Sequence, residues 1–141
     1  MREFVLDSSV TLAWFFQDEA AASTDGLLDE LNQDGRAHVA VHWALEVSNT
    51  LLTAERRKRC SVAESTHFLN LLSALAIEVD PETASQAGTT TLGLARAQNL
   101  TLYDGAYLEL AMRRHLPLAT LDQDLRAAAK KVGVDCLPEK I

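Results

Sequence analysis

Short apolar runs alternate with longer segments of helical spacing along this chain, and that alternation restricts its possible folds more than any other feature. We predict strands at 3–7, 38–41, 76–80 and 118–120, the first two of them buried, and an edge strand at 134–137. Apolar residues at helical spacing lie between them, at about 8–15, 19–32, 42–57, 62–75, 81–98, 104–114 and 124–132. Strands that alternate with helices form parallel sheets, because each crossover carries a helix onto a face of the sheet. We therefore predict an α/β fold with a mostly parallel central sheet and helices on both faces.

Several expected helix ends carry recognisable signals. Ser8 or Ser9 can cap the first helix, because a hydroxyl accepts a hydrogen bond from a free backbone N–H. Ser61, with Glu64 three residues later, forms a capping box. Pro81 suits the first turn of a helix that continues to about residue 98. These signals place the breaks between elements independently of the apolar pattern.

Length and composition indicate one soluble domain. The chain has 141 residues, of which 48% are hydrophobic and 23% charged. No run approaches the roughly 18 apolar residues of a membrane span, and the N-terminus lacks the apolar stretch of a signal peptide. Cys60 and Cys136 are too few and too far apart for a disulfide framework or a thiolate metal site. We expect a single domain over residues 1–141 that is cytoplasmic and makes no membrane contact.

Three acidic residues follow expected strands or extended segments. Asp7 ends the strand at 3–7, Asp122 comes just after the strand at 118–120, and Asp104 follows a short extended piece at 100–102. Sites in parallel α/β sheets form outside the carboxyl ends of the strands. The fold therefore sends three carboxylates toward the same edge of the sheet.

A fourth acid lies on the helix at 42–57. Glu46, Asn49 and Thr53 form a polar stripe on a helix that is otherwise largely apolar. If that stripe faces the sheet edge, four carboxylates share one cavity and raise one another's pKa unless a cation is present. Oxygen ligands of this kind suit Mg²⁺ or Mn²⁺, which activate water and stabilise a leaving oxygen. Hydrolysis of phosphodiester bonds is the reaction that this chemistry favours.

Each acid also has a purely structural interpretation. Asp7, Asp104 and Asp122 could cap helices, and Asp124 could equally cap the last helix. Glu46 could lie on a solvated helix face. The joint placement favours the metal site, because a sheet edge offers few positions and acids take three of them.

The net charge of −7 argues against nucleic acid, which attracts basic surfaces. That argument weakens if part of the acidity lies in a metal pocket and if the basic residues cluster locally, as at 56–59, 113–114 and 130–131. An aromatic content of 6% is too low to indicate a stacking platform for single strands. Any contact with nucleic acid should then involve mainly its backbone.

Four segments, in this order and spacing, resemble the motifs of PIN-domain ribonucleases of the VapC toxin type. They are Phe4-Val5-Leu6-Asp7-Ser8-Ser9-Val10, Trp43-Ala44-Leu45-Glu46-Val47-Ser48-Asn49, Leu102-Tyr103-Asp104-Gly105-Ala106-Tyr107-Leu108-Glu109-Leu110-Ala111 and Leu118-Ala119-Thr120-Leu121-Asp122-Gln123-Asp124-Leu125. The resemblance covers nearly the whole chain. One departure is Gly105, where the family more often has Ala.

The resemblance implies a three-layer α/β/α sandwich and a Mg²⁺- or Mn²⁺-dependent endoribonuclease that cleaves a structured RNA. Asp7 and Asp104 would be direct metal ligands. Glu46 and Asp122 would hold a second ion or position the attacking water. By the same resemblance, the supporting residues would be Thr120, which would orient the neighbouring carboxylate, Asn49, Ser8 and, as a possible extra ligand, Asp124.

The resemblance also implies partners. Such proteins form homodimers and are neutralised by a small VapB-like antitoxin whose tail packs along an apolar groove, for which Phe16 and its neighbours are candidates. Two other functions stay open. A haloacid-dehalogenase-like phosphatase would use Asp7 as its nucleophile, although Ser9 stands where that class has a second Asp. A catalytically silent PIN-fold binding module would keep the fold without activity.

Overall fold

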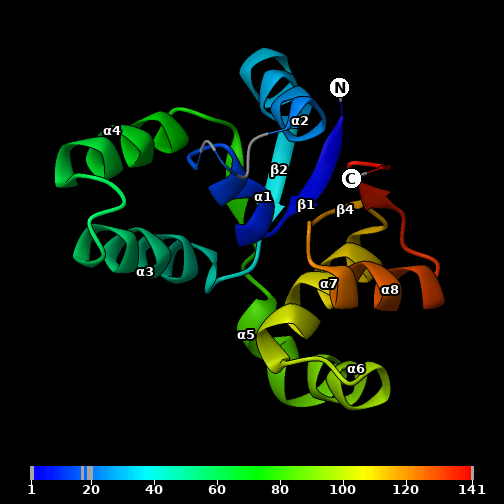
Figure 1. The fold of residues 1–141 in the computed structure, drawn as a ribbon. Helices are drawn as coiled ribbons and strands as arrows, with labels where there is room; N and C mark the ends of the chain where they lie inside the picture. The colour runs from blue at the N-terminus through cyan, green and yellow to red at the C-terminus, as the bar shows by residue number, and fades with distance from the viewer. Residues whose placement is uncertain (1, 17, 19–20, 141) are drawn as a thin grey trace.

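The centre of the molecule is a five-stranded, all-parallel sheet in the order β3-β2-β1-β4-β5 (Figure 1). The structure is a computed structural model, and it describes residues 2–16, 18 and 21–140. The strands are β1 (Glu3–Leu6), β2 (Arg36–Val39), β3 (Ile77–Val79), β4 (Leu118–Ala119) and β5 (Cys136–Leu137). Helices flank this sheet, so the predicted three-layer α/β/α architecture is confirmed.

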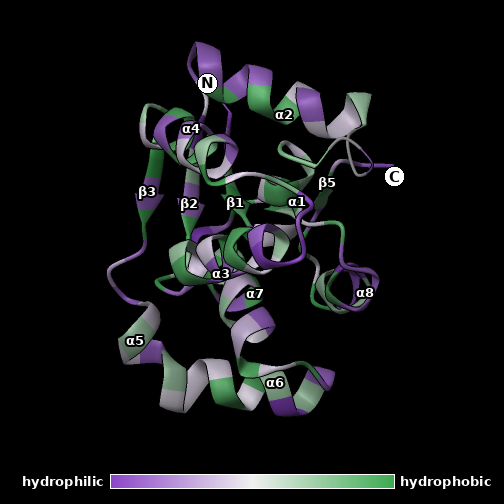
Figure 2. Cartoon of the chain, turned by 60° about the vertical axis from the view of Figure 1, so that its left-hand side comes forward, coloured by the Kyte–Doolittle hydropathy of each residue, from purple (hydrophilic) through white to green (hydrophobic). Residues whose placement is uncertain are grey.

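The helices follow the strands in the alternation that the sequence predicts. They are α1 (Ser8–Ala13), α2 (Ala22–Gln33), α3 (Trp43–Arg56), α4 (Val62–Ser73), α5 (Thr83–Gln86), the π-helical turn η1 (Ala87–Thr91), α6 (Leu92–Gln98), α7 (Leu102–Arg114) and α8 (Gln123–Lys131). Hydrophilic and hydrophobic residues alternate along α2 and α8, as expected for helices with one buried face (Figure 2). Among the described residues, none of these helices has the length and apolar character that a membrane crossing needs.

The central strand β1 and helix α7 form the middle of the core. Phe4, Val5 and Leu6 of β1 are fully buried, and so are Leu108 and Leu110 of α7, which packs against β1 and β4. Central parallel strands are covered on both faces, which explains why β1 is apolar without alternation.

The chain changes direction across the sheet between β1 and β4. From β1 the chain continues to β2 and β3 on one side, while β4 and β5 lie on the other side. The loops that leave β1 and β4 therefore start next to each other, and the backbone N–H of Asp7 donates to the carbonyl oxygen of Ala119 at 3.1 Å. Parallel α/β sheets bind ligands at such a switch point.

Two local predictions are wrong in ways that concern the acids. Asp7, rather than Ser8 or Ser9, caps α1, because its carboxylate accepts a hydrogen bond of 3.2 Å from the backbone N–H of Val10. Of the expected extended piece at 100–102, Thr101 has an extended backbone, but Leu102 already belongs to α7. Thr101 caps α7, and its hydroxyl accepts from the backbone N–H of Asp104 at 3.1 Å, so Asp104 lies in the first helical turn.

Two further predictions differ from the structure. The helix expected from Pro81 to about residue 98 is interrupted by the π-helical turn η1 and divided into α5 and α6. Phe16, a candidate for apolar surface offered to a partner, is only 7% exposed because the Arg59 guanidinium covers its ring at 4.5 Å. The capping box of Ser61 and Glu64 is confirmed, with both reciprocal hydrogen bonds present.

Two glycines lie at close approaches of backbone or helices. Gly35 follows α2, and a Cβ there would lie 2.7 Å from the carbonyl oxygen of Glu30. A Cβ at Gly105 would lie 3.3 Å from the Cβ of Ala95, because α6 crosses close to α7 at this point. Close helix packing therefore gives a physical reason for glycine at position 105.

Candidate active site

Asp7 is a buried carboxylate held by hydroxyl groups from two parts of the chain. It is 4% exposed, and it accepts hydrogen bonds from Ser9 Oγ at 2.7 Å and from Thr120 Oγ1 at 2.5 Å. Burial raises the pKa of Asp7 to about 6. The hydrogen bonds from Thr120, Ser9 and Val10 oppose this rise, whereas the negative charge of Asp104 adds to it. The fold thus holds the Asp7 side chain in surroundings that disfavour its ionised form.

Ser9 and Thr120 connect the loops after β1 and β4. Besides bonding Asp7, the Ser9 hydroxyl accepts from the backbone N–H of Leu121 at 2.9 Å, and the Thr120 hydroxyl accepts from the N–H of Asp122 at 3.1 Å. Both hydroxyls therefore donate to the carboxylate and accept from the backbone of the loop after β4. This arrangement fixes the orientation of Asp7 relative to Asp122.

Asp104 and Asp122 meet Asp7 from two other elements. Asp104 lies in the first turn of α7, and Asp122 caps α8 by accepting from the N–H of Leu125 at 2.9 Å. Burial raises the pKa of Asp104, and the charges of Asp122 and Glu46 raise it further, against smaller opposing effects of Thr101 and His42. The carboxylates are therefore close enough to influence one another electrostatically.

Glu46, in the first turn of α3, is held by Tyr107 of α7. The Tyr107 hydroxyl donates to Glu46 Oε1 at 2.5 Å, and His42 Nε2 lies 3.7 Å from the same oxygen. Burial raises the pKa of Tyr107, and the bond to Glu46 raises it further, so the phenol stays protonated and donates. Tyr107 and His42 are not among the candidates that the sequence indicates. The signal that could have found them is their spacing: Tyr107 lies three residues after Asp104 and His42 four before Glu46, so each shares a helix face with an acid.

Each of the four acids lies at or near a helix N-terminus, where free N–H groups favour negative charge. Among the ion pairs of the described residues, none joins Asp7, Glu46, Asp104 or Asp122 to a lysine or arginine. The acidic edge therefore concentrates negative charge that no lysine or arginine of these regions neutralises.

Asp80, at the same edge of the sheet, differs from these four acids because it has an arginine partner. Asp80 follows β3, is buried, and receives Arg113 Nη2 at 2.7 Å and the Thr83 hydroxyl at 2.9 Å. Burial alone would raise the pKa of Asp80, but the bonds from Arg113 and Thr83 and the arginine charge lower it below its ordinary value. Arg113 also pairs with Glu109 and Glu82. Asp80 thus has a structural cation, a pairing that the sequence pattern does not indicate, whereas Asp7 has none.

The donors at the acidic edge fit a hard divalent cation, because they are carboxylate and hydroxyl oxygens. Over residues 2–16, 18 and 21–140, no three Asp, Glu, His or Cys side chains are close enough to form a closed ligand set. Hydroxyls of Ser9 and Thr120 donate to Asp7, and the hydroxyl of Tyr107 donates to Glu46. Such an arrangement suits an ion that takes one or two carboxylates and keeps several waters, as Mg²⁺ does.

The structure places the proposed supporting residues unequally. Thr120 bonds Asp7 directly. Asn49 is exposed one turn after Glu46, and Asp124 is exposed in the first turn of α8. No hydrogen bond found among the described residues involves the side chain of Ser8. The contacts that were expected of Ser8 are made by Ser9.

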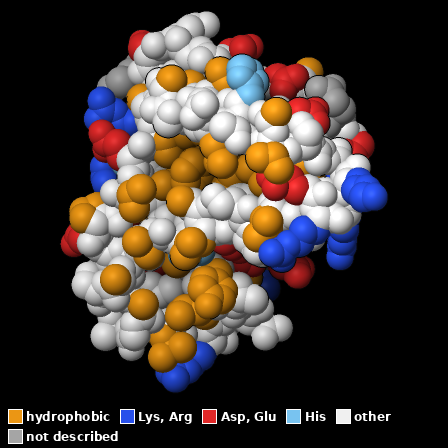
Figure 3. All heavy atoms as spheres, turned by 90° about the vertical axis from the view of Figure 1, so that its left-hand side faces the viewer, with side chains coloured by type: hydrophobic (Ala, Val, Ile, Leu, Met, Phe, Trp, Pro, Cys, Tyr) orange, Lys and Arg blue, Asp and Glu red, His pale blue; other side chains and the backbone are white. Residues whose placement is uncertain are grey.

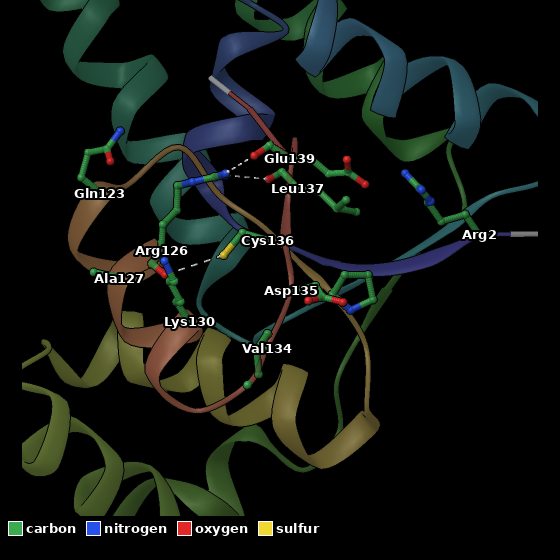
Figure 4. Close-up of a pocket in the computed structure, with 12 residues that line it drawn as sticks. Arg2, Gln123, Arg126, Ala127, Lys130, Val134, Asp135, Cys136, Leu137 and Glu139 are labelled. Atoms are coloured by element: carbon green, nitrogen blue, oxygen red, sulfur yellow. Dashed lines mark hydrogen bonds between the residues drawn. The ribbon is translucent and has the colours of Figure 1, made fainter.

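A hollow of about 740 Å³ lies beside α8 and β5, and none of the four acids lines it. Figure 4 shows Arg126 reaching from α8 toward the C-terminal segment there. Its guanidinium donates to the carbonyl oxygens of Pro138 at 2.7 Å and Thr120 at 2.9 Å. Arg126 therefore links the C-terminal segment to the loop that carries Thr120. Through this loop it stabilises the acidic edge without lying among the four acids.

Comparison with known proteins agrees with this description. A family model described as the PIN domain matches residues 4–131. The solved structure of PAE2754 from Pyrobaculum aerophilum is 25% identical, with a TM-score of 0.68 over 96% of this chain and 90% of that one. A search of curated proteins finds no match.

Two more distant structures share the fold. VapBC2 from Rickettsia felis, bound to a DNA fragment from its promoter, is 10% identical, with a TM-score of 0.64 over 95% of this chain and 96% of that one. VapC20 from Mycobacterium tuberculosis, described as a Sarcin-Ricin loop cleaving toxin, is 15% identical, with a TM-score of 0.61 over 89% and 94%. Because the family model spans most of the sequence and the fold agrees with it, the chain belongs to the PIN domain family.

Proposed function

We propose that this protein is a Mg²⁺- or Mn²⁺-dependent endoribonuclease that hydrolyses phosphodiester bonds in RNA, and that it is the toxin of a toxin–antitoxin pair. The observation that carries the proposal is that Asp7, Glu46, Asp104 and Asp122 lie at one sheet edge without a lysine or arginine partner among the described residues. Carboxylates gathered in this way are stable together when a cation joins them.

Asp7 and Asp104 would hold the ion directly, and Glu46 and Asp122 would hold a second ion or orient water. A bound divalent ion supplies a more acidic water and stabilises charge on the phosphate oxygens. The chain's own groups orient the ligands. Thr120 and Ser9 fix the Asp7 carboxylate, and Asn49, Ser8 and Asp124 would be supporting polar groups.

Tyr107 has a further task in this proposal. Its buried phenol keeps one oxygen of Glu46 occupied, so the other carboxylate oxygen is left for water or an ion. Because the phenol pKa is raised above its ordinary value of 10.0, Tyr107 remains a hydrogen-bond donor at neutral pH. The hydroxyl therefore fixes the carboxylate without competing for the cation as a phenolate would.

The direct test is RNA cleavage by the purified protein with Mg²⁺, with Mn²⁺ and with EDTA. Asp7→Asn and Asp104→Asn should each reduce cleavage by at least about 100-fold, because each removes a ligand charge while keeping the side-chain shape. Asp29→Asn, on the exposed face of α2, is the matched control and should cleave as the wild type does. Undiminished cleavage by both site variants would reject the assignment.

An apolar groove supports the proposal of an antitoxin partner. Figure 3 shows the face of α3 and α4, where hydrophobic side chains gather around a hollow. This hollow, about 210 Å³, is lined chiefly by Trp43, Val47, Leu69, Leu72, Ile77 and Val79. With Phe16 buried, this groove replaces it as the surface for the apolar tail of a VapB-like antitoxin. Co-expression with the gene product of the adjacent reading frame, followed by co-purification, tests the partner.

We also propose that the protein is a homodimer in the cytoplasm. The support is the exposure of the apolar side chains of Val41, Leu45 and Leu52, in and just before α3. Light scattering on the purified chain measures the mass directly. A monomer at micromolar concentration would overturn the dimer without affecting the nuclease proposal.

A further inference from the structure

The rings of Tyr107, His42 and Tyr103 pack in series from the acidic edge to the surface. The centroids of Tyr107 and His42 are 5.0 Å apart, and those of His42 and Tyr103 are 5.3 Å apart, with the rings edge to face in both pairs. The inner ring, Tyr107, is 1% exposed and bonds Glu46, whereas Tyr103 is 61% exposed. The exposed ring of this series, Tyr103, thus belongs to the residue next to Asp104.

The outer ring is held in place by its neighbours. His42 Nε2 lies 3.1 Å from the carbonyl oxygen of Tyr103, and because a carbonyl only accepts, this nitrogen carries the proton and donates. The same bond joins the first turn of α7 to the N-terminus of α3. An exposed tyrosine fixed at its backbone and supported by a second ring has already lost much of the freedom that binding would otherwise cost.

The charge around this ring restricts what can cover it. The first turns of α3 and α7 contain Glu46 and Asp104 and no lysine or arginine. The basic run at 56–59 begins at the opposite end of α3, about 20 Å away along a helix of this length. Phosphates near the four acids would therefore gain little from basic side chains, so affinity close to the scissile bond must come from another part of the nucleotide.

We propose that Tyr103, supported by His42, is a stacking platform for one unpaired base of the RNA, next to the phosphate at the acidic edge. The inference rests on the proposed ribonuclease function. Every base has a π-face that can stack on tyrosine, and single-stranded RNA is commonly bound in this way. The low aromatic content predicted no such platform, but the fold brings its few rings together at the place where one would act. Tyr103 acts here as a positioning residue.

The test uses an RNA that the wild type cleaves, together with a series in which one nucleotide at a time beside the cleaved bond is abasic. For the wild type, the abasic change at one flanking position should raise KM by about 5- to 20-fold. Tyr103→Ala should raise KM for the intact RNA by a similar factor, and the same abasic change should then have no further effect. Tyr103→Phe and Tyr103→Trp should restore the selectivity for a base. Met112→Ala, an exposed apolar residue near the far end of α7, should behave as the wild type does.

Three results would overturn the inference. One is a Tyr103→Ala variant with an unchanged KM. Another is a variant whose sensitivity to the abasic series equals that of the wild type. The third is conversion of a dimer to a monomer by Tyr103→Ala with normal RNA kinetics, which would assign the ring to a contact between copies. Failure of the wild type to cleave any RNA with Mg²⁺ or Mn²⁺ would instead reject the ribonuclease function, and the platform with it.

Discussion

Thr120 donates a hydrogen bond of 2.5 Å to Oδ2 of Asp7, a residue 113 positions away in the chain. The same hydroxyl accepts from the backbone N–H of Asp122, so one oxygen links the loops after β1 and β4. This contact depends on the adjacency of β1 and β4 in the sheet. Through it, Thr120 supports the Asp7 carboxylate.

Replacement of Thr120 by valine should impair activity without changing the side-chain shape. The change removes a donor to Asp7 and an acceptor for Asp122 together. We expect a loss of about 10- to 100-fold in RNA cleavage, typical of groups that orient metal ligands. Steady-state kinetics with Mg²⁺ measure it. Thr120→Ser should retain most of the activity, and Thr66→Val, on the exposed surface of α4, should retain all of it. Equal activities of the valine and serine variants would contradict this role.

The stability of the metal-free protein should fall as the pH rises from about 4 to about 6. Asp7 has a pKa of about 6 in the folded protein and an ordinary value of 3.8, so the folded state binds its proton more tightly. The contribution is fully present below the ordinary value and is lost as the pH passes through 6, with a size on the order of 3 kcal/mol. Denaturant unfolding in EDTA measures it.

Asp7→Asn provides the control for this pH dependence. The variant should lose the Asp7 contribution while keeping that of Asp80, which has the opposite sign because its pKa is lowered. The difference between wild-type and variant curves therefore isolates Asp7. Mg²⁺ should reduce the pH dependence of the wild type by binding the ionised form. Parallel curves for the two proteins in EDTA would show that Asp7 does not titrate in this range.

The sheet and the position of the acids were predictable because they depend on local patterns. Apolar runs with helical segments between them require a parallel sheet, and the carboxyl ends of its strands share an edge. The extended piece expected at 100–102 ends one residue early because Thr101 uses its hydroxyl to start α7 at Leu102, a local bond that outweighs the apolar pattern. The break in the helix after Pro81 falls on Gly88 and the three threonines at 89–91, which are poor helix formers, although the apolar pattern continues through it.

The partners of the acids were harder to predict. Ser9 and Ser8 are equivalent in sequence, and only the approach of Leu121 and Thr120 distinguishes them. The pairing of Asp80 with Arg113 joins residues 33 positions apart, between the end of β3 and the last turn of α7. Periodicity places residues on faces, but it does not specify which faces meet. This limit explains why the sequence indicated the acids yet missed Tyr107.

Removal of Arg113 should destabilise the protein more than removal of an exposed arginine. Arg113→Met leaves Asp80 and Glu109 buried without their cation, and loss of one partner from a buried pair costs about 3–5 kcal/mol. Chemical denaturation at neutral pH measures the loss, which should shrink in acid as the carboxylates gain protons. Arg114→Met is the adjacent, exposed control and should change stability by less than about 0.5 kcal/mol. Similar losses from both variants would contradict the importance of the cluster.

Two glycine substitutions should separate helix propensity from helix packing. A methyl group added to Gly93 in α6 would have no atom within 4 Å, so Gly93→Ala should stabilise the protein by about 0.5–1 kcal/mol. Gly105→Ala gains the same propensity but brings its methyl group to 3.3 Å from Ala95 Cβ, so α6 and α7 must separate slightly. We expect Gly105→Ala to lower the thermal midpoint, and Ala95→Gly in the same chain to recover part of that loss. An increase in the midpoint for Gly105→Ala equal to that for Gly93→Ala would show that α6 yields freely and that crowding does not explain the glycine.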